Sequence, residues 1–550
     1  MKRLTSYVLL FFIVGCTLQN FTAIAQDSPT QSIEPLLDLA FTKAERDSLF
    51  RGLQNNQRTI KAIHEYVLSN SVGMSMQFNP LPQGFSIDQK QNPIAWGLPI
   101  NVKVPANQED LAFYTVAQLS VLIKSKKITS TQLTKLYVDR LKKYGDTLQC
   151  VITVMEAHAF AQAKKADQEI AAGKYKGPLH GIPFGVKDLI AIKGTKTTWG
   201  AMPYKDQTID ETATIVTKLE NAGAILIAKF TLGALAMGDV WYGGVTKNPW
   251  DLTQGSSGSS AGSASATAAG LVAFSIGTET LGSIVSPSTR CGVSGLRPTY
   301  GRVSRYGAMA LSWSMDKIGP ITRSALDCAM VFETIRGSDA IDPNVRDAAF
   351  NYSATTDLKK LKIGYIKSFF EADYSNKDAD QKVLEVIRGL GINPEPIDFS
   401  FDVPVTPIRM MLIAEAAAAF DELTRSNRDS LLVSQLNWSW PNSFRTARFI
   451  PAVEYINASR MRTALIEEYN KKLAEYDVII TPSFGGNQLL VTNLTGHPCL
   501  VVPNGFDDKG HPTSISFLGK LFGEASVIAV GRAYQEASEW DEKHPDFFKK

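Results

Sequence analysis

Two serines in glycine-rich segments and one lysine in an apolar segment are the residues whose types and settings predict covalent chemistry. Ser259 lies within Gly255–Gly262, and Ser283 follows the turn Gly277–Gly282. A serine hydroxyl is a weak nucleophile unless a base lies at hydrogen-bond distance. Lys187 is a candidate base, because burial disfavours the ammonium and leaves a neutral amine near pH 7. Taken alone, its segment also fits an exposed lysine on the wet face of a strand.

The residues around the two serines predict packed structure rather than a flexible linker. Gly255–Gly262 by itself has the composition of a linker. Residues 264–276 instead predict a small-residue helix followed by a buried strand. The turn after that strand can aim several backbone N–H groups at one point, which is the geometry of an oxyanion hole. We therefore interpret the stretch from Asn248 to Arg302 as an active site.

Helices and buried strands alternate around this stretch and predict an α/β domain with a largely covered sheet. Thr129 or Ser130 is the expected cap of one helix, and Gly145, Gly173 and Gly223 are expected to end three helices. We expect no transmembrane span. The expected elements are helix 130–144, strand 151–154, helix 156–172, a helix containing 215–219, strand 224–228, strand 361–365, a helix containing 383–387, and strand 392–399.

The first 25 residues predict an export signal that is removed from the mature chain. Lys2 and Arg3 precede an apolar run, 7–18, that is too short to span a bilayer. Cleavage after Ala25 is one interpretation. The other is a lipobox-like sequence that leaves Cys16 as a lipidated N-terminus. Both interpretations place the protein outside the cytoplasm, as a periplasmic, secreted or lipid-anchored protein.

Residues 26–110 predict a helical extension followed by an irregular linker. Thr42 and Glu45 form a capping-box sequence at the start of helical periodicity. We expect these helices to pack on the main body, the alternative being an extension that gates substrate or binds a partner. Pro, Asn, Gln and Gly dominate residues 71–108, which favours irregular chain wrapping the domain.

Composition excludes several function classes. The 57 Lys and Arg nearly cancel the 54 Asp and Glu, so we expect a small-molecule or peptide partner and no nucleic acid. The six histidines show no metal-binding spacing, so we expect no metal. No C-x-x-C pair is present after the signal, and the cysteines there are expected to be buried apolar residues. These are Cys150, Cys291, Cys328 and Cys499.

Several spaced motifs resemble the amidase signature family, serine hydrolases of carboxamides. The resemblance covers residues 111–550 and leaves the extension outside it. It implies that family's fold, a large mixed β-sheet core covered by helices on both faces. The motifs that carry it are Gly177-Pro-Leu-His-Gly-Ile-Pro-Phe-Gly-Val-Lys187-Asp188, Asn248-Pro249-Trp250, Gly258 to Ser263, Gly277-Thr278, Gly282-Ser283-Ile284, Cys291 to Val293, Gly295 to Arg302, Asp477 to Pro482, and Thr492 to Pro498.

The resemblance assigns three catalytic residues and implies no cofactor. It places the family's lysine at Lys187, its bridging serine at Ser259 and its nucleophile at Ser283. By the same resemblance, Ser259 relays a proton from Ser283 to neutral Lys187, and the peptide bond between Gly258 and Ser259 is cis. The expected oxyanion donors are the backbone N–H groups of Thr280, Leu281, Gly282 and Ser283.

Four positions depart from the family pattern. Leu281 replaces a usual glycine, Glu279 a usual aspartate, Val285 a usual arginine and Arg290 a usual aromatic residue. A leucine resists positive φ and narrows the pocket. We therefore expect altered substrate shape rather than lost activity.

Two other interpretations of the site fit short motifs. The glycine-rich segment matches a nucleophile elbow, which would make Ser260 the nucleophile with His497 or His511 as base. An elbow needs a strand directly before it, and the preceding residues are polar. Ser314 and Lys317 match the S-x-x-K of penicillin-interactive enzymes, but the other motifs of those enzymes are missing.

The expected function is that of an exported amidase that cleaves a carboxamide, either a peptide amide or an acyl amide, through an acyl-enzyme. One alternative is the glutaminase subunit of a tRNA-dependent amidotransferase, which an export signal argues against. The other is a non-catalytic binding homologue. A set of Met and aromatic residues is interpreted as an apolar acyl site or as core. The set is Met410, Met411, Phe420, Trp438, Trp440, Phe444 and Phe449.

Overall fold

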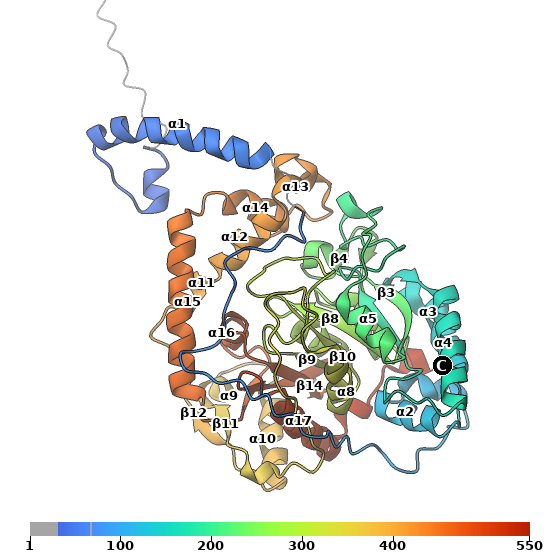
Figure 1. Ribbon diagram of the computed structural model, residues 1–550. Helices are drawn as coiled ribbons and strands as arrows, with labels where there is room; N and C mark the ends of the chain where they lie inside the picture. The colour runs from blue at the N-terminus through green and yellow to red at the C-terminus, as the bar shows by residue number, and fades with distance from the viewer. Residues whose placement is uncertain (1–30, 66–68, 550) are drawn as a thin grey trace, which may run out of the picture. The chain divides into compact units, whose positions relative to one another are not determined.

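A computed structural model of the chain describes residues 31–65 and 69–549 (Figure 1). The chain divides into two compact units, Met1–Ser69 and Asn70–Lys550. The export signal predicted for residues 1–25, with Cys16 and Ala25, lies outside the described residues. Within the described residues, no helix is both long and apolar enough to cross a membrane.

The smaller unit contains a short 3-10 helix, η1 (Glu34–Leu37), and a long helix, α1 (Lys43–Glu65). The predicted capping box begins α1. The N–H of Thr42 donates to the Glu45 carboxylate at 2.6 Å, and the N–H of Glu45 donates to Thr42 Oγ1 at 3.3 Å. Arg46 pairs with Glu34 at 2.8 Å and joins the two helices. The packing of this extension on the main body stays a prediction.

The larger unit is built on one mixed sheet of 11 strands, which confirms the predicted α/β class. The strand order is β1-β3-β2-β8-β10-β9-β14-β15-β13-β11-β12. β2 is parallel to β8, and β8 is antiparallel to β10. The sheet strands are β1 (Val151–Val154), β2 (Pro183–Lys187), β3 (Ile225–Phe230), β8 (Phe274–Glu279), β9 (Ser294–Arg297), β10 (Lys317–Thr322), β11 (Ile363–Ile366), β12 (Glu395–Ile397), β13 (Val478–Pro482), β14 (Cys499–Phe506) and β15 (Pro512–Gly519).

Helices cover both faces of this sheet. α6 (Ala261–Ala268) and α7 (Val285–Cys291) pack together on one face over a small apolar cluster that includes Ile321. α8 (Ala325–Ile335) and α17 (Glu524–Ser538) pack together on the opposite face, against β9, β10, β14 and β15 (Figure 1). The strands β2 and β8 and the helices α6 and α7, which carry or border the candidate site residues, are therefore held between packed layers.

The remaining elements surround this core. Two short hairpins, β4 (Val240–Trp241) with β5 (Gly244–Val245) and β6 (Lys247–Asn248) with β7 (Asp251–Gly255), lie outside the main sheet. The other helices are α2 (Val116–Lys124), α3 (Ser130–Leu148), α4 (Glu156–Ala171), α5 (Thr214–Asn221), α9 (Lys367–Glu371), α10 (Lys377–Gly389), α11 (Val405–Ile408), α12 (Met410–Ala419), α13 (Asp421–Arg425), α14 (Trp440–Ala447), α15 (Ala452–Leu473) and α16 (Gln488–Thr495).

The elements predicted along the chain are present, but one helix end was predicted wrongly. α3 continues past Gly145 to Leu148, and Gln149 takes the left-handed conformation with φ of 48°. Leu148 is fully buried, so the additional residues add to the core. Gly145 serves close packing instead, because a Cβ there would lie 3.1 Å from the Val151 side chain. The four cysteines after the predicted signal are buried and free, as expected.

Candidate active site

Lys187 is the last residue of β2, a strand whose five residues are all buried. Its side chain has no exposed surface. Nζ donates to Ser259 Oγ at 2.7 Å, to Thr278 Oγ1 at 2.9 Å and to Ser260 Oγ at 3.2 Å. Burial lowers the pKa of Lys187 to about 7. The amine thus lies among three hydroxyl groups and is able to accept a proton near neutral pH.

Ser259 lies between β7 and α6. The Gly258–Ser259 peptide bond is cis, as predicted. Glycine is required at 258, because a Cβ there would lie 1.9 Å from the carbonyl oxygen of Gly238. The next residue, Ser260, fixes this segment to β8, since its Oγ accepts from Thr278 N at 3.1 Å and donates to Thr278 O at 3.0 Å.

Ser283 lies in the turn between β8 and α7, with 8% of its surface exposed. The Ser260 N–H donates to Ser283 O at 3.2 Å, so the two serine segments touch through the backbone. Ser259 Oγ accepts its hydrogen bond from Lys187 Nζ. Among the described residues, no hydrogen bond joins the Oγ atoms of Ser259 and Ser283. Catalytic hydrogen bonds often tighten only when substrate is bound.

The backbone N–H groups of the turn are available to a ligand. Among the described residues, those of Thr280, Leu281, Gly282 and Ser283 have no protein acceptor. The left-handed φ of the turn, 86°, falls on Gly282, and Leu281 is not in a left-handed conformation. The backbone strain expected for a leucine at this position therefore does not arise. The role of these groups as oxyanion donors stays a prediction.

Glu279, the last residue of β8, holds the turn that follows it. One carboxylate oxygen accepts from the N–H groups of Ile284 and Val285 at 2.9 Å and 3.0 Å. The other accepts from Arg297 at 2.7 Å and from Asn493 at 2.9 Å. Burial raises the pKa of this carboxyl, but Arg297, Lys317 and Asn493 together outweigh burial and lower the pKa to about 2. Glu279, which stands where the family usually has an aspartate, thus still holds the turn with a charged carboxylate.

Asp316 supports the same turn through Thr280. Thr280 Oγ1 donates to Asp316 Oδ1 at 2.5 Å, and the N–H groups of Leu311 and Ser312 donate to Oδ2 at 2.8 Å and 2.9 Å. The orientation of Thr280 therefore depends on the loop after Ala310. The sequence predicted no role for Asp316 or for Thr278, although Thr278 lies in the motif Gly277-Thr278, because no local pattern connects either side chain to Lys187 or to Thr280.

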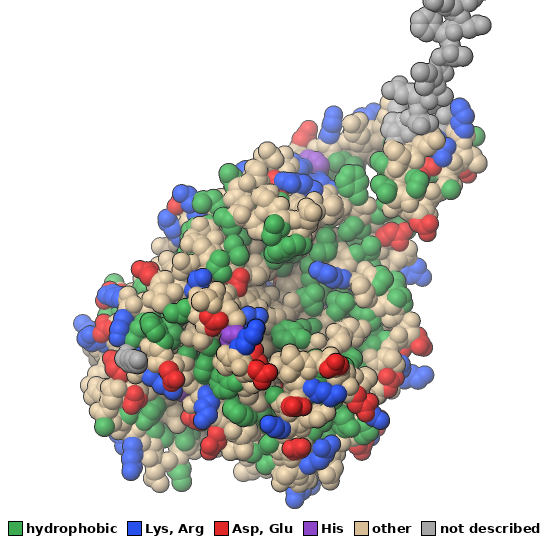
Figure 2. Space-filling view, turned by 180° about the vertical axis from the view of Figure 1, so that it is seen from behind, with side chains coloured by type: hydrophobic (Ala, Val, Ile, Leu, Met, Phe, Trp, Pro, Cys, Tyr) green, Lys and Arg blue, Asp and Glu red, His purple; other side chains and the backbone are tan. Residues whose placement is uncertain are grey.

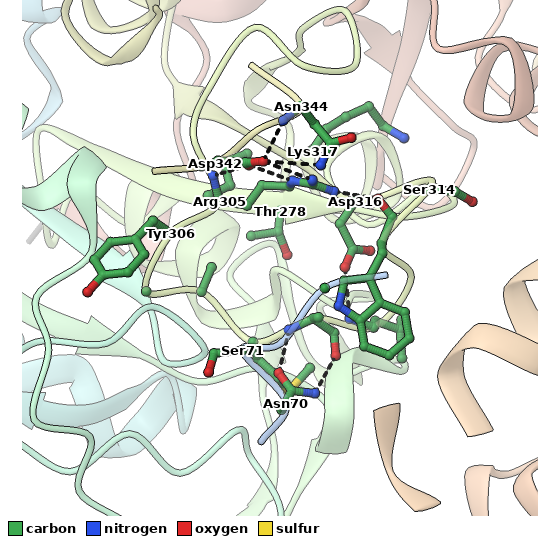
Figure 3. A pocket seen from close by; sticks show the side chains of 18 of the residues that line it. Asn70, Ser71, Thr278, Arg305, Tyr306, Ser314, Asp316, Lys317, Asp342 and Asn344 are labelled. Carbon is green, nitrogen blue, oxygen red and sulfur yellow. Dashed lines mark hydrogen bonds and ion pairs between the residues drawn. The ribbon is translucent and has the colours of Figure 1, made fainter. Parts of the chain in front are cut away.

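A cavity of about 390 Å³ adjoins this arrangement (Figure 3). Thr278 and Thr280 line it, so it lies next to Lys187 and to the turn. In Figure 3, Asn70 and Ser71 lie along one edge and Arg305, Asp342 and Asn344 along another, with Thr278 between them. Ser259 and Ser283 do not line it.

The Met and aromatic set interpreted as an acyl site lies elsewhere, and the core interpretation fits most of it. None of its members lines the cavity. Trp440 and Phe420 stack on Phe444 with centroid distances of 5.0 Å and 5.5 Å. Trp438 and Phe449 are instead exposed. The aromatic rings pack with one another rather than around the reacting groups, because α12 and α14 face each other.

No described contact supports either of the two other interpretations, the nucleophile elbow at Ser260 or the S-x-x-K motif at Ser314 and Lys317. A strand, β7, does precede the glycine-rich segment, contrary to expectation. However, Ser260 Oγ bonds Thr278 and Lys187, and His497 bonds Thr495 instead. Ser314 Oγ donates to Glu415 at 2.7 Å and is not bonded to Lys317. Within the part of the chain that the structure describes, no group of His, Cys, Asp and Glu has the arrangement of a metal site.

Comparison with known proteins finds similar chains. A family model described as Amidase matches residues 132–490. A glutamyl-tRNA(Gln) amidotransferase subunit from Dehalococcoides mccartyi is 32% identical over 489 residues, which cover 79% of this chain and 99% of that protein.

Solved structures show the same fold. The peptide amidase from Stenotrophomonas maltophilia superposes with a TM-score of 0.71 at 28% identity, covering 78% of this chain and 98% of that one. An amidase family protein from Bacillus anthracis gives a TM-score of 0.71 at 29% identity, covering 82% of this chain and 95% of that one.

Proposed function

The chain belongs to the amidase signature family, and from that membership we propose a carboxamide hydrolase with Ser283 as nucleophile, Ser259 as proton relay and Lys187 as base. Members of this family are amidohydrolases that act on C–N bonds. The observation that carries the proposal is the buried 2.7 Å hydrogen bond from Lys187 to Ser259, with the Lys187 pKa lowered to about 7.

The proposed reaction has two stages. Ser283 Oγ bonds the amide carbonyl carbon while its proton passes through Ser259 to Lys187. The N–H groups of the turn stabilise the oxyanion. The C–N bond then breaks, the leaving nitrogen takes the proton back, and an acyl ester remains on Ser283. Water cleaves this ester by the same proton path, which returns Ser283 and releases a carboxylic acid.

Two functions fit this chemistry, an exported amidase that acts alone and a glutaminase subunit of an amidotransferase, and they differ in substrate and partner. The curated relatives are components of glutamyl-tRNA(Gln) amidotransferases, and they support a glutaminase subunit more strongly than an exported amidase. The signal expected in residues 1–25 supports an exported enzyme that acts alone. In Figure 2, Lys and Arg are interspersed with Asp and Glu on the face shown, so this face is not a one-sign patch for nucleic acid.

Ammonia release by the purified full chain separates these two functions. Glutamine, acetamide, hexanamide and a peptide amide are supplied to the chain alone and to the chain mixed with the other subunits of a bacterial amidotransferase. Hydrolysis of simple or peptide amides by the chain alone supports a stand-alone amidase. Activity on glutamine that requires the other subunits supports the glutaminase role. If neither mixture releases ammonia from any of them, the proposed function is contradicted and the binding homologue is left.

Fractionation of cells that express the untruncated chain tests export. We expect the mature protein in the periplasmic or membrane-anchored fraction, with a mass that identifies cleavage after Ala25 or a lipidated Cys16. Full-length protein confined to the cytoplasm would contradict export and favour the glutaminase role.

The pH dependence of the reaction follows from Lys187. Burial lowers the pKa to about 7, against the opposing charges of Asp316 and Glu279. A base acts only when it is deprotonated, so we expect kcat/KM to rise with pH through about 7 and to be about tenfold lower at pH 6 than on the plateau. Initial rates with a neutral amide at pH values from below to above 7 measure this rise in kcat/KM. A flat profile from about pH 5.5 to pH 8.5 would exclude Lys187 as the titrating base.

Leu281→Gly tests whether the leucine impairs the site. Because Leu281 already lies outside the left-handed region, the substitution relieves no backbone strain. We expect kcat/KM to stay within about tenfold of the unsubstituted enzyme, with a shift in preferred substrate size. A rise of well over tenfold on all amides would mean that Leu281 obstructs the native site.

A further inference from the structure

Residues 70–78, here called the strap, form one wall of the cavity beside the reacting groups. The Asn70 side chain pairs with the Ala310 backbone, accepting from its N–H at 2.7 Å and donating to its carbonyl at 2.9 Å. At the other end, the Phe78 ring meets Tyr300 edge-on at 5.0 Å, and the guanidinium of Arg462 lies 3.4 Å from its centroid. The strap is thus fastened at both ends.

The cavity wall is mainly apolar. The strap contributes Met74, Met76 and Phe78, and the facing wall includes Leu189, Met309 and Leu311. Of the charged residues in the lining, Arg305 is paired with Asp342 at 3.0 Å and Asp316 accepts from Thr280 at 2.5 Å. Glu211 and Lys317 also line the cavity. Methionine side chains adapt to irregular apolar ligands. A cavity of this size and lining suits a small apolar group.

One polar group in this wall has no protein partner. The indole Nε1 of Trp313, another cavity residue, is buried and has no hydrogen-bond acceptor in the part of the chain that the structure describes. Gly73 of the strap lies against the same ring, since a Cβ at Gly73 would be 3.7 Å from Trp313 Cδ1. Trp313 therefore contributes its ring to the wall beside the strap, while its N–H is itself buried.

The cavity lies beside the reacting groups and is separated from them by two threonines. Thr278 lines it and accepts from Lys187 Nζ at 2.9 Å, and Thr280 lines it and carries one of the expected oxyanion donors. The strap itself lies outside residues 132–490, which the family model matches. The strap thus brings a segment from the N-terminal region to the wall of the cavity.

We propose that the strap is a specificity element of the amide site and that an apolar group of the substrate occupies the cavity beneath it. The proposal rests on the proposed function. The apolar group belongs either to the acyl part or to the amine part of the amide. In both cases Met74 and Met76 contact it, and the preference of the enzyme for larger apolar amides depends on them.

Two substrate series distinguish the acyl side from the amine side. One runs from acetamide through butanamide to hexanamide, and the other is a series of N-alkyl acetamides of increasing alkyl length. The purified full chain is compared with the double variant Met74→Gln and Met76→Gln, which keeps side-chain length but introduces polar groups. For the longest members of one series, we expect kcat/KM to fall by about tenfold or more, with acetamide within about twofold. The affected series identifies the side.

Three controls make the test decisive. Met202→Gln substitutes a partly exposed methionine that does not line the cavity, and it should leave both series unchanged. Asn70→Ala removes the hydrogen bonds that fasten the strap at Ala310, and it should reproduce the loss of kcat/KM for the longest substrates. It also tests the proposal if the double variant proves unstable. Thermal unfolding of each variant checks that the fold is retained.

An equal loss on all substrates, or an unchanged length profile in a folded variant, would overturn the role of the strap. If the unsubstituted chain hydrolyses no amide at all, the proposed function fails separately. Calorimetric binding of hexanamide to the unsubstituted chain and to the double variant then decides the strap proposal, which requires weaker binding by the variant.

Discussion

Ser283→Ala is expected to lower kcat for amide hydrolysis by about 10⁴-fold or more, because it removes the proposed nucleophile and Thr280, the other hydroxyl of the turn, is bonded to Asp316. Ser283 is 8% exposed in a turn whose N–H groups at residues 280–283 have no acceptor in the described part of the chain, so loss of one oxygen should leave the fold intact. Ammonia release measures the rate, and mass spectrometry of the unsubstituted enzyme quenched with substrate should locate the acyl group on Ser283.

Ser286→Ala is the matched control for this variant, since Ser286 is a partly buried serine near the start of α7. It should retain most of the activity. If Ser283→Ala kept more than about a tenth of the rate, another nucleophile would have to be sought.

Lys187→Met is expected to lower kcat by about 10²- to 10⁴-fold, the usual contribution of a general base. Methionine has a similar length and tolerates the fully buried position, so the loss should reflect the missing amine rather than a cavity. The activity that remains should no longer rise with pH through about 7, because the group whose pKa lies there is gone. Rates across this pH range, with thermal unfolding of the variant, measure both effects.

Lys218→Met provides the comparison for Lys187. Lys218 is another lysine whose pKa burial lowers, but its Nζ donates to the backbone carbonyls of Arg336 and Gly337, away from the serines. The Lys218→Met variant should keep both the activity and its rise with pH through about 7. Retention of this rise in Lys187→Met would assign it to a different group.

The residues that act through local sequence were predictable from the chain alone. Lys187 follows an apolar run and becomes the buried end of β2, and Ser283 follows β8, because strand patterning and glycine-supported turns are local signals. The cis bond before Ser259 was expected only from the family resemblance, and the structure confirms it.

The residues that act through long-range contacts were not predictable. Asp316 reaches Thr280 from a loop, and Met74 reaches the site from a segment interpreted as an irregular linker. Neither has a spacing relation to the serines, so only the folded chain brings them there. The end of α3 was missed for a similar reason, since the burial of Leu148 depends on tertiary packing.

The departures from the family pattern also have local explanations in the structure. Val285 is fully buried at the start of α7, where its N–H donates to Glu279. Arg290 is exposed and donates to Gln254 at 2.9 Å. These contacts show how the chain accommodates the substituted residues around the turn without losing its hydrogen bonds.

During synthesis, β9 presents an open sheet edge from the time that it emerges until β14 has emerged as well. Its partner on one side, β10, follows soon after it, but its partner on the other side, β14, begins only at Cys499. An unpaired strand edge is a template for aggregation. Nascent or C-terminally shortened chains that end before β14 are therefore the forms that most need a chaperone, and a proofreading protease would find them by this edge.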